Sequence, residues 1–180
     1  SDVYKRQLEK DINLQIAKKL QEELESRGIS VLMTREEDKG LYDEDADNKQ
    51  VQDLKRRVEL INETAPALAV SIHQNSYPSP DVSGSQIFYF EHSKEGEEMA
   101  NTVQKQIENL EGIKNRPIKG NDTYYLLRRT EVPTMIIECG FLSNQEEATR
   151  LAEESYQETL AKAIADGIEE CLRSAGSEND

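Results

Sequence analysis

Apolar residues recur every three or four positions over residues 8–27, a spacing that places them on one face of an α-helix. That face comprises Leu8, Ile12, Ile16, Leu20 and Leu24, widened by Leu14 and Ala17. Gly28 follows directly and is typical of a helix end. The β-branched segment 29–34 then predicts a strand, so the chain opens with a helix–strand unit of an α/β layer fold.

The later apolar segments continue to alternate between strand and helix patterns. Short apolar runs predict strands over residues 67–72, 86–90 and 134–138, with a further short strand near 116–119. Helical spacing predicts helices over residues 50–63, 96–109, 144–152 and 155–174, and a helical turn over 124–128. Residues 35–53 are acidic and loop-like, residues 1–7 carry no readable pattern, and residues 175–180 form a frayed tail.

Composition narrows the classes of protein without naming one. A length of 180 residues suits a single domain with one core. The net charge of −14 disfavours binding to nucleic acid or anionic lipid, and no apolar run is long enough to span a membrane. The two cysteines, Cys139 and Cys171, are too few for a structural cysteine–zinc site, and their spacing leaves a disulfide open.

Three polar residues are candidates for chemistry, two at the ends of predicted strands and Glu9 at the start of the first predicted helix. His73 and Glu138 each follow a buried strand, and binding groups gather at the carboxyl ends of such strands. A half-buried Glu138 needs a metal, a base or hydrogen-bond donors. Each residue also has a plain structural interpretation: His73 as a strand-end residue, Glu138 as a solvated one, and Glu9 as a partner of the helix dipole.

Together these residues resemble part of a catalytic zinc site. Such sites use three protein ligands and leave one position for water. His73 and Glu9 supply two ligands, and Glu138 supplies a carboxylate for general base and acid work. The second histidine, His92, lies in a charged turn and is interpreted as a solvated residue.

Five ordered segments carry a more specific resemblance. The chain is similar to the zinc-dependent N-acetylmuramoyl-L-alanine amidases of the amidase-3 type, with sporulation and germination enzymes the most alike. The resemblance covers about residues 8–172 and rests on residues 8–17, 31–38, 54–62, on Ser71-Ile72-His73-Gln74-Asn75, and on residues 132–144 with Pro133, Glu138, Gly140 and Phe141.

The resemblance implies a fold, a reaction and a site. The fold is a three-layer α/β domain over residues 8–174, with a twisted, mostly parallel sheet flanked by helices on both faces. The reaction is hydrolysis of the amide bond between N-acetylmuramic acid and L-alanine in peptidoglycan, outside the cytoplasmic membrane and by a monomer. Glu9 and His73 would bind Zn²⁺, Glu138 would be the catalytic carboxylate, and Asn75 would contact substrate, while Arg35 and Arg57 match structural positions.

One part of the family pattern is missing from the printed sequence. The family's first zinc ligand is a histidine in a Gly-His-Gly-Gly motif that precedes the Glu9 motif, and residues 1–7 do not resemble it. With two ligands in place of three, we expect weak zinc binding and little activity from these 180 residues. One zinc retained through dialysis, with hydrolysis of peptidoglycan, would contradict that expectation.

Two other functions stay open at this level. The missing histidine favours a non-catalytic domain that binds peptidoglycan or a partner, whereas His73 and Glu138 argue for an enzyme. Binding to insoluble peptidoglycan without release of amino groups would select the first. A zinc peptidase on a similar sheet fits the motifs less well.

Overall fold

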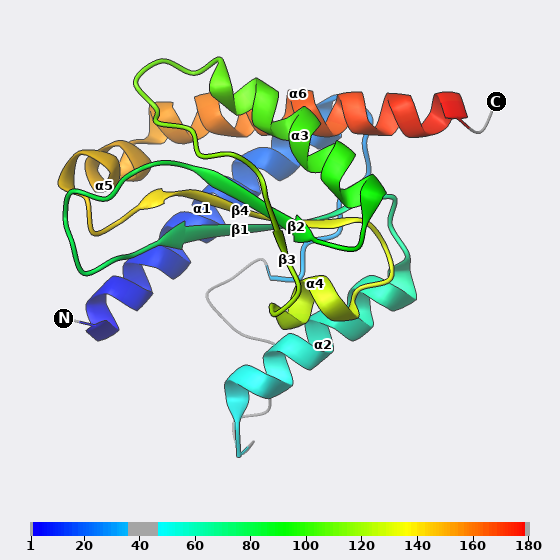
Figure 1. Ribbon diagram of the computed structural model, residues 1–180, viewed down its shortest axis with the longest axis horizontal. Coiled ribbons are helices and arrows are strands. Elements are labelled where there is room, and N and C mark those ends of the chain that lie inside the picture. The colour runs from blue at the N-terminus through cyan, green and yellow to red at the C-terminus, as the bar shows by residue number, and fades with distance from the viewer. Residues whose placement is uncertain (1, 36–46, 179–180) are drawn as a thin grey trace.

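The computed structural model describes residues 2–35 and 47–178, which form six helices and four strands (Figure 1). In chain order these are α1 (Asp2–Ser26), α2 (Lys49–Thr64), β1 (Ala69–Asn75), β2 (Gln86–Phe90), α3 (Lys94–Glu108), β3 (Lys119–Asn121), α4 (Tyr125–Arg129), β4 (Thr134–Phe141), α5 (Gln145–Ala152) and α6 (Glu154–Glu178).

The four strands form one open, mostly parallel sheet in the order β1-β4-β2-β3. Strands β1 and β4 are parallel, as are β2 and β3, while β2 and β4 run antiparallel. Consequently β4, the most apolar strand, lies in the interior of the sheet, and its neighbours on both sides help to bury it.

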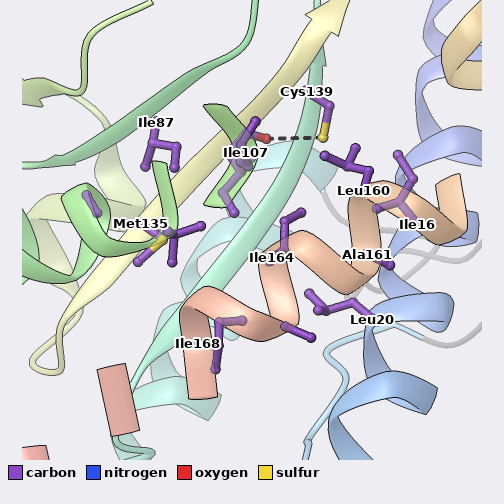
Figure 2. Close-up of a cluster of buried hydrophobic side chains, with 14 of the residues drawn as sticks. Ile16, Leu20, Ile87, Ile107, Met135, Cys139, Leu160, Ala161, Ile164 and Ile168 are labelled. Atoms are coloured by element: carbon purple, nitrogen blue, oxygen red, sulfur yellow. Dashed lines mark hydrogen bonds between the residues drawn. The ribbon is translucent and has the colours of Figure 1, made fainter. Parts of the chain in front are cut away.

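The larger core lies on one face of this sheet, where α1, α3 and α6 pack against the strands and against one another. The spacing of four residues brings Ile12, Ile16 and Leu20 of α1 to this face. Strand β4 contributes every second residue, Met135, Ile137 and Cys139. Figure 2 shows Met135 and Cys139 among the side chains of this core. The helical pattern and the strand alternation therefore meet in a single apolar layer.

A smaller cluster occupies the opposite face. Phe88, Leu127 and Ile136 are its buried members, with Phe90 and Leu126 packed beside them. Helix α4 supplies the leucines, and α2 lies against α4, on the side of the sheet away from α3 and α6 (Figure 1). Helices on both faces of a mostly parallel sheet make the predicted three-layer α/β architecture, which is confirmed.

Three details differ from the sequence-based expectations. Helix α1 begins at Asp2, so residues 2–7 are helical, and a hydrogen bond from Gln7 Nε2 to Asp11 Oδ1 (3.0 Å) spans one turn there. The 29–34 strand is wrong: Ile29 and Val31 pack on the core, but the described part of the chain gives this segment no ladder partner. The tail is helical through Glu178.

Two further expectations can be compared with the described residues. No helix in residues 2–35 and 47–178 is long and apolar enough to cross a bilayer. Most of the acidic loop predicted over residues 35–53 lies outside the described part of the chain, because residues 36–46 are not described. Its last residues begin α2, where Asn48 Oδ1 caps the helix by accepting from the Val51 amide at 3.1 Å.

Candidate functional site

His73 and Glu138 lie side by side on the face of the sheet that carries α4. They are paired in the parallel register of β1 and β4. Because Ile137 and Cys139 point into the large core, alternation directs Glu138 to the opposite face. The same rule places Ser71 and His73 together on that face. Two polar residues predicted from separate strand ends are thus brought together by the register.

Glu9 reaches this pair from helix α1. Its Oε1 lies 3.6 Å from Nδ1 of His73, and the two side chains are 32% and 42% exposed. Because α1 begins at Asp2, Glu9 lies about two turns inside the helix. The dipole effect is confined to the first turn, so the dipole interpretation of Glu9 does not hold. Arg35 Nη2 donates to the carbonyl of Lys10 (3.1 Å), beside Glu9.

The other ring nitrogen of His73 also has a partner. Nε2 lies 2.8 Å from the hydroxyl of Ser71, two residues earlier on the same strand. The imidazole is therefore contacted at both nitrogens, by a hydroxyl and by a carboxylate. The sequence pattern drew attention to Ser71 only as part of a motif, and its spacing of two residues from His73 was the available signal.

The surroundings of the Glu138 carboxyl shift its pKa. Burial raises its pKa; the nearby imidazole of His73 opposes the shift, and the negative charge of Glu9 adds to it. Its Oε2 is buried without a hydrogen-bond partner in the described structure. A buried carboxylate oxygen without a donor is costly unless a proton or a cation satisfies it. The environment therefore favours proton uptake or interaction with a cation.

Asn75 ends β1 beside an irregularity in the sheet. The register shifts between His73 and Asn75, so that Asn75 pairs with Phe141. The Asn75 carbonyl accepts from the Leu142 amide (2.8 Å), and its Oδ1 accepts from the Ser76 amide (2.8 Å). The extra residue on β4 bends the strand end next to Glu138, a common device beside functional sites.

A buried carboxylate that sequence reasoning missed holds the next turn in place. Glu147 on α5 is buried, and its Oε1 accepts from the Phe141 amide (3.0 Å) and the Gly84 amide (2.9 Å). It thereby ties the end of β4 to the loop before β2. Gly84 has φ +120°, and a Cβ there would lie 3.1 Å from Nε of Arg116, so this position requires glycine. Asn144 Oδ1 caps α5 by accepting from the Glu147 amide at 3.0 Å.

The remaining candidates lie elsewhere. His92 is in an exposed turn after β2, six residues along from Gln86, the β2 partner of Glu138. At about 3.3 Å a residue, the four steps of β2 from Gln86 to Phe90 alone put about 13 Å between this turn and the pair, which supports its interpretation as a solvated residue. Both cysteines are buried and free, and burial raises the pKa of Cys139 to about 12.

The group contains the side-chain types that a cation site with a base requires. Imidazole nitrogen and carboxylate oxygen are ligands that zinc accepts, and a carboxyl with a raised pKa exchanges protons with water readily. Across the described ranges, no three His, Cys, Asp or Glu side chains form a group that could hold a metal ion. Glu9 and His73 therefore stand as two facing donors, with Glu138 beside them.

Comparison with known proteins now identifies the family. Residues 2–170 match the family model Amidase_3, N-acetylmuramoyl-L-alanine amidase. A germination-specific N-acetylmuramoyl-L-alanine amidase of Bacillus subtilis is 39% identical over 165 residues, which cover 89% of this chain and 69% of that protein. A probable cell wall amidase of Staphylococcus aureus, LytH, is 29% identical over 163 residues, covering 91% and 50%.

Solved structures agree with this assignment. The CwlD amidase from Clostridioides difficile, in complex with the GerS lipoprotein, has a TM-score of 0.88 and 38% identity, covering 92% of this chain and 87% of that one. An N-acetylmuramoyl-L-alanine amidase from Clostridium difficile 630 has a TM-score of 0.82 and 33% identity, covering 92% and 84%. The chain belongs to the N-acetylmuramoyl-L-alanine amidase family, the hydrolases that its motifs resemble.

Proposed function

We propose that this chain hydrolyses the amide bond between N-acetylmuramic acid and L-alanine in peptidoglycan, with Glu9, His73 and Glu138 as the working residues. Family membership supports the reaction class. The observation that carries the assignment of residues is the grouping of one imidazole and two carboxylates from α1, β1 and β4: Glu9 lies 3.6 Å from His73, and His73 is paired with Glu138 in the sheet register.

The donor set fits zinc. The Glu9 carboxylate and the His73 imidazole face each other at 3.6 Å, and Glu138 Oε2 is buried with no protein partner in the described structure. Glu9 and His73 would hold the ion, and a third protein donor remains to be identified. When bound, zinc supplies an acidified water and a positive charge that polarises the substrate carbonyl.

Glu138 is proposed to move the protons. Its carboxylate takes a proton from the attacking water as the water oxygen bonds to the lactyl carbonyl carbon. The carbon–nitrogen bond then breaks, and the protonated Glu138 delivers that proton to the departing nitrogen of L-alanine. A pKa raised by burial suits both steps, because the group must accept and release a proton near neutral pH.

Asn75 is proposed to contact the substrate. Its Oδ1 is occupied by the Ser76 amide, so the Nδ2 group is the donor that it offers to a substrate carbonyl. Its position at the end of β1, two residues after His73, supports this role. The shifted register beside it also sets the direction of the strand end.

The location of the proposed substrate indicates where the protein acts. Peptidoglycan lies outside the cytoplasmic membrane, and the cell wall and germination relatives support that compartment. A charge of −14 argues against nucleic acid as a partner. We propose that the chain works as a monomer on its substrate, and that a lipoprotein like the one bound to CwlD is the kind of protein partner to test by co-purification.

The test is chemical identification of the bond that breaks. The protein is incubated with Zn²⁺ and purified peptidoglycan, and the products are analysed for new L-alanine amino termini and for glycan with an intact lactyl group. Both products are expected once a third zinc donor completes the site, whereas the 180 residues alone, with two donors, are expected to release little of either. Sedimentation with peptidoglycan without new amino termini would instead select the non-catalytic binding domain. Cleavage within the peptide stem would select a zinc peptidase.

A further inference from the structure

We propose that the hydroxyl of Ser71 is a positioning group for His73, holding the imidazole so that Nδ1 faces Glu9. The inference rests on the proposed role of His73 as a metal donor. Ser71 Oγ lies 2.8 Å from His73 Nε2, well within hydrogen-bond distance. The two residues are separated by one position on β1, so their side chains leave the same face of the strand.

The orientation of the His73 ring is fixed by a contact at each of its two nitrogens. One nitrogen contacts Ser71, and the other lies 3.6 Å from Glu9 Oε1. A neutral imidazole carries its proton on one nitrogen and a lone pair on the other. If Nδ1 donates its lone pair to a cation shared with Glu9, the proton must be on Nε2. The Ser71 oxygen is then its acceptor.

A hydroxyl suits this position better than another polar group. It both donates and accepts, so Ser71 can serve His73 whichever nitrogen carries the proton. Its neighbour across the β1–β4 pair is Ile136, an apolar residue of the smaller core cluster. Ser71 is therefore a short polar side chain that the sheet directs at the ring. Residues that orient a ligating histidine in this way typically change metal affinity about 10- to 100-fold.

The expected change in Zn²⁺ affinity depends on how exposed the His73 side chain is. The His73 side chain is 42% exposed, so water can replace the lost hydroxyl in part. We therefore expect Ser71→Ala to weaken Zn²⁺ binding about 10-fold, at the low end of that range. Ser71→Thr keeps the hydroxyl and should stay within about twofold of the wild type. Ser30→Ala removes an exposed hydroxyl from the segment after α1 and serves as the matched control.

The first measurement is Zn²⁺ affinity by competition with a chelating dye, on the whole chain and its variants. The wild type, Ser30→Ala and Ser71→Thr should bind Zn²⁺ with similar affinity, and Ser71→Ala should bind it more weakly. Equal affinities for Ser71→Ala and the wild type would overturn the proposal. So would a Ser71→Thr variant as weak as Ser71→Ala, because the loss would then not depend on the hydroxyl.

A second measurement does not depend on metal. The side-chain nitrogen and carbon resonances of histidine report ring protonation and environment, and the chain has only His73 and His92. In metal-free protein, Ser71→Ala should shift the His73 resonances and leave those of His92 unchanged. If neither changes, the contact does not hold the ring and the proposal fails. If the wild type binds no Zn²⁺ but His73 responds as predicted, His73 holds no metal within these 180 residues, while the positioning by Ser71 stands.

Discussion

Replacing Glu147 by alanine tests whether one buried carboxylate fixes the loops around the candidate site. In the wild type, Glu147 Oε1 accepts from the amides of Gly84 (2.9 Å) and Phe141 (3.0 Å). Glu147→Ala would leave both amides without this acceptor. Each orphaned buried donor costs about 1–3 kcal/mol, so the two together predict a loss of about 2–6 kcal/mol. That is a large share of the roughly 5–15 kcal/mol that stabilises a domain.

The neighbouring residue provides a matched control. Glu146 lies in the same first turn of α5, but its side chain is 83% exposed and pairs with Arg150 at 3.3 Å. Glu146→Ala should change stability by no more than about 0.5 kcal/mol. Both substitutions remove one charge from the same helix terminus. Their difference therefore isolates the buried hydrogen bonds from the interaction with the helix dipole.

The assay is urea unfolding followed by circular dichroism. Glu147→Ala should lower the midpoint strongly at an unchanged slope, and Glu146→Ala should coincide with the wild type. Glu147→Gln keeps an acceptor oxygen and should fall between them. The reasoning is refuted if Glu147→Ala and Glu146→Ala unfold at the same urea concentration.

Two further predictions concern the core. Gly167→Ala places a Cβ 2.7 Å from Cα of Val103, so helices α3 and α6 must separate, and we expect the free energy of unfolding to fall by about 1–3 kcal/mol in thermal or urea unfolding. The control Gly176→Ala, whose added Cβ has nothing within 4 Å, should not lower it. Equal effects of the two substitutions would contradict the packing argument. Burial raises the pKa of Cys139 to about 12 and of Cys171 to about 11, so both thiols should resist alkylation in the folded protein and react in urea. As pH rises above about 8.5 the unfolded chain loses thiol protons that the folded chain keeps, so stability should fall; a rise there, or fast labelling of the folded protein, would count against this burial.

Much of the fold could be predicted because local pattern and packing agree. The spacing of Ile12, Ile16 and Leu20 defines a helix face whatever it packs on, and that face is buried as expected. Likewise, the run around Ile136 and Ile137 needs two covered faces, and both are covered. In these elements the spacing of apolar residues along the sequence is enough to predict which side chains are buried.

The 29–34 segment shows where pattern is insufficient. Its β-branched residues have strand propensity, but a strand also needs a neighbour to complete its hydrogen bonds. Ile29 and Val31 bury their side chains without such a ladder in the described residues. The start of α1 shows the opposite case, since residues 2–7 have no apolar stripe and are nevertheless helical.

The sequence predicted which residues belong to the candidate site but not how they contact one another. His73 and Glu138 could be found because each stands at the end of an apolar run, but their placement at strand ends was wrong, since β1 continues to Asn75 and β4 to Phe141. Their pairing depends on sheet order, which sequence does not give directly. The spacing of two residues puts Ser71 on the same strand face as His73, but only the structure shows the contact between them; Glu147 acts through a distant loop, which spacing does not reveal.

The assignment of Glu138 as the proton-transferring carboxylate is the claim on which the proposed mechanism depends. The most direct measurement is release of L-alanine amino termini from peptidoglycan by the native gene product that contains this chain, with Glu138→Gln compared with the exposed control Glu146→Gln. Loss of general acid–base catalysis predicts a fall in turnover of about 100- to 10,000-fold for Glu138→Gln alone, with zinc content and unfolding midpoint preserved. Near-normal turnover in Glu138→Gln would contradict the account.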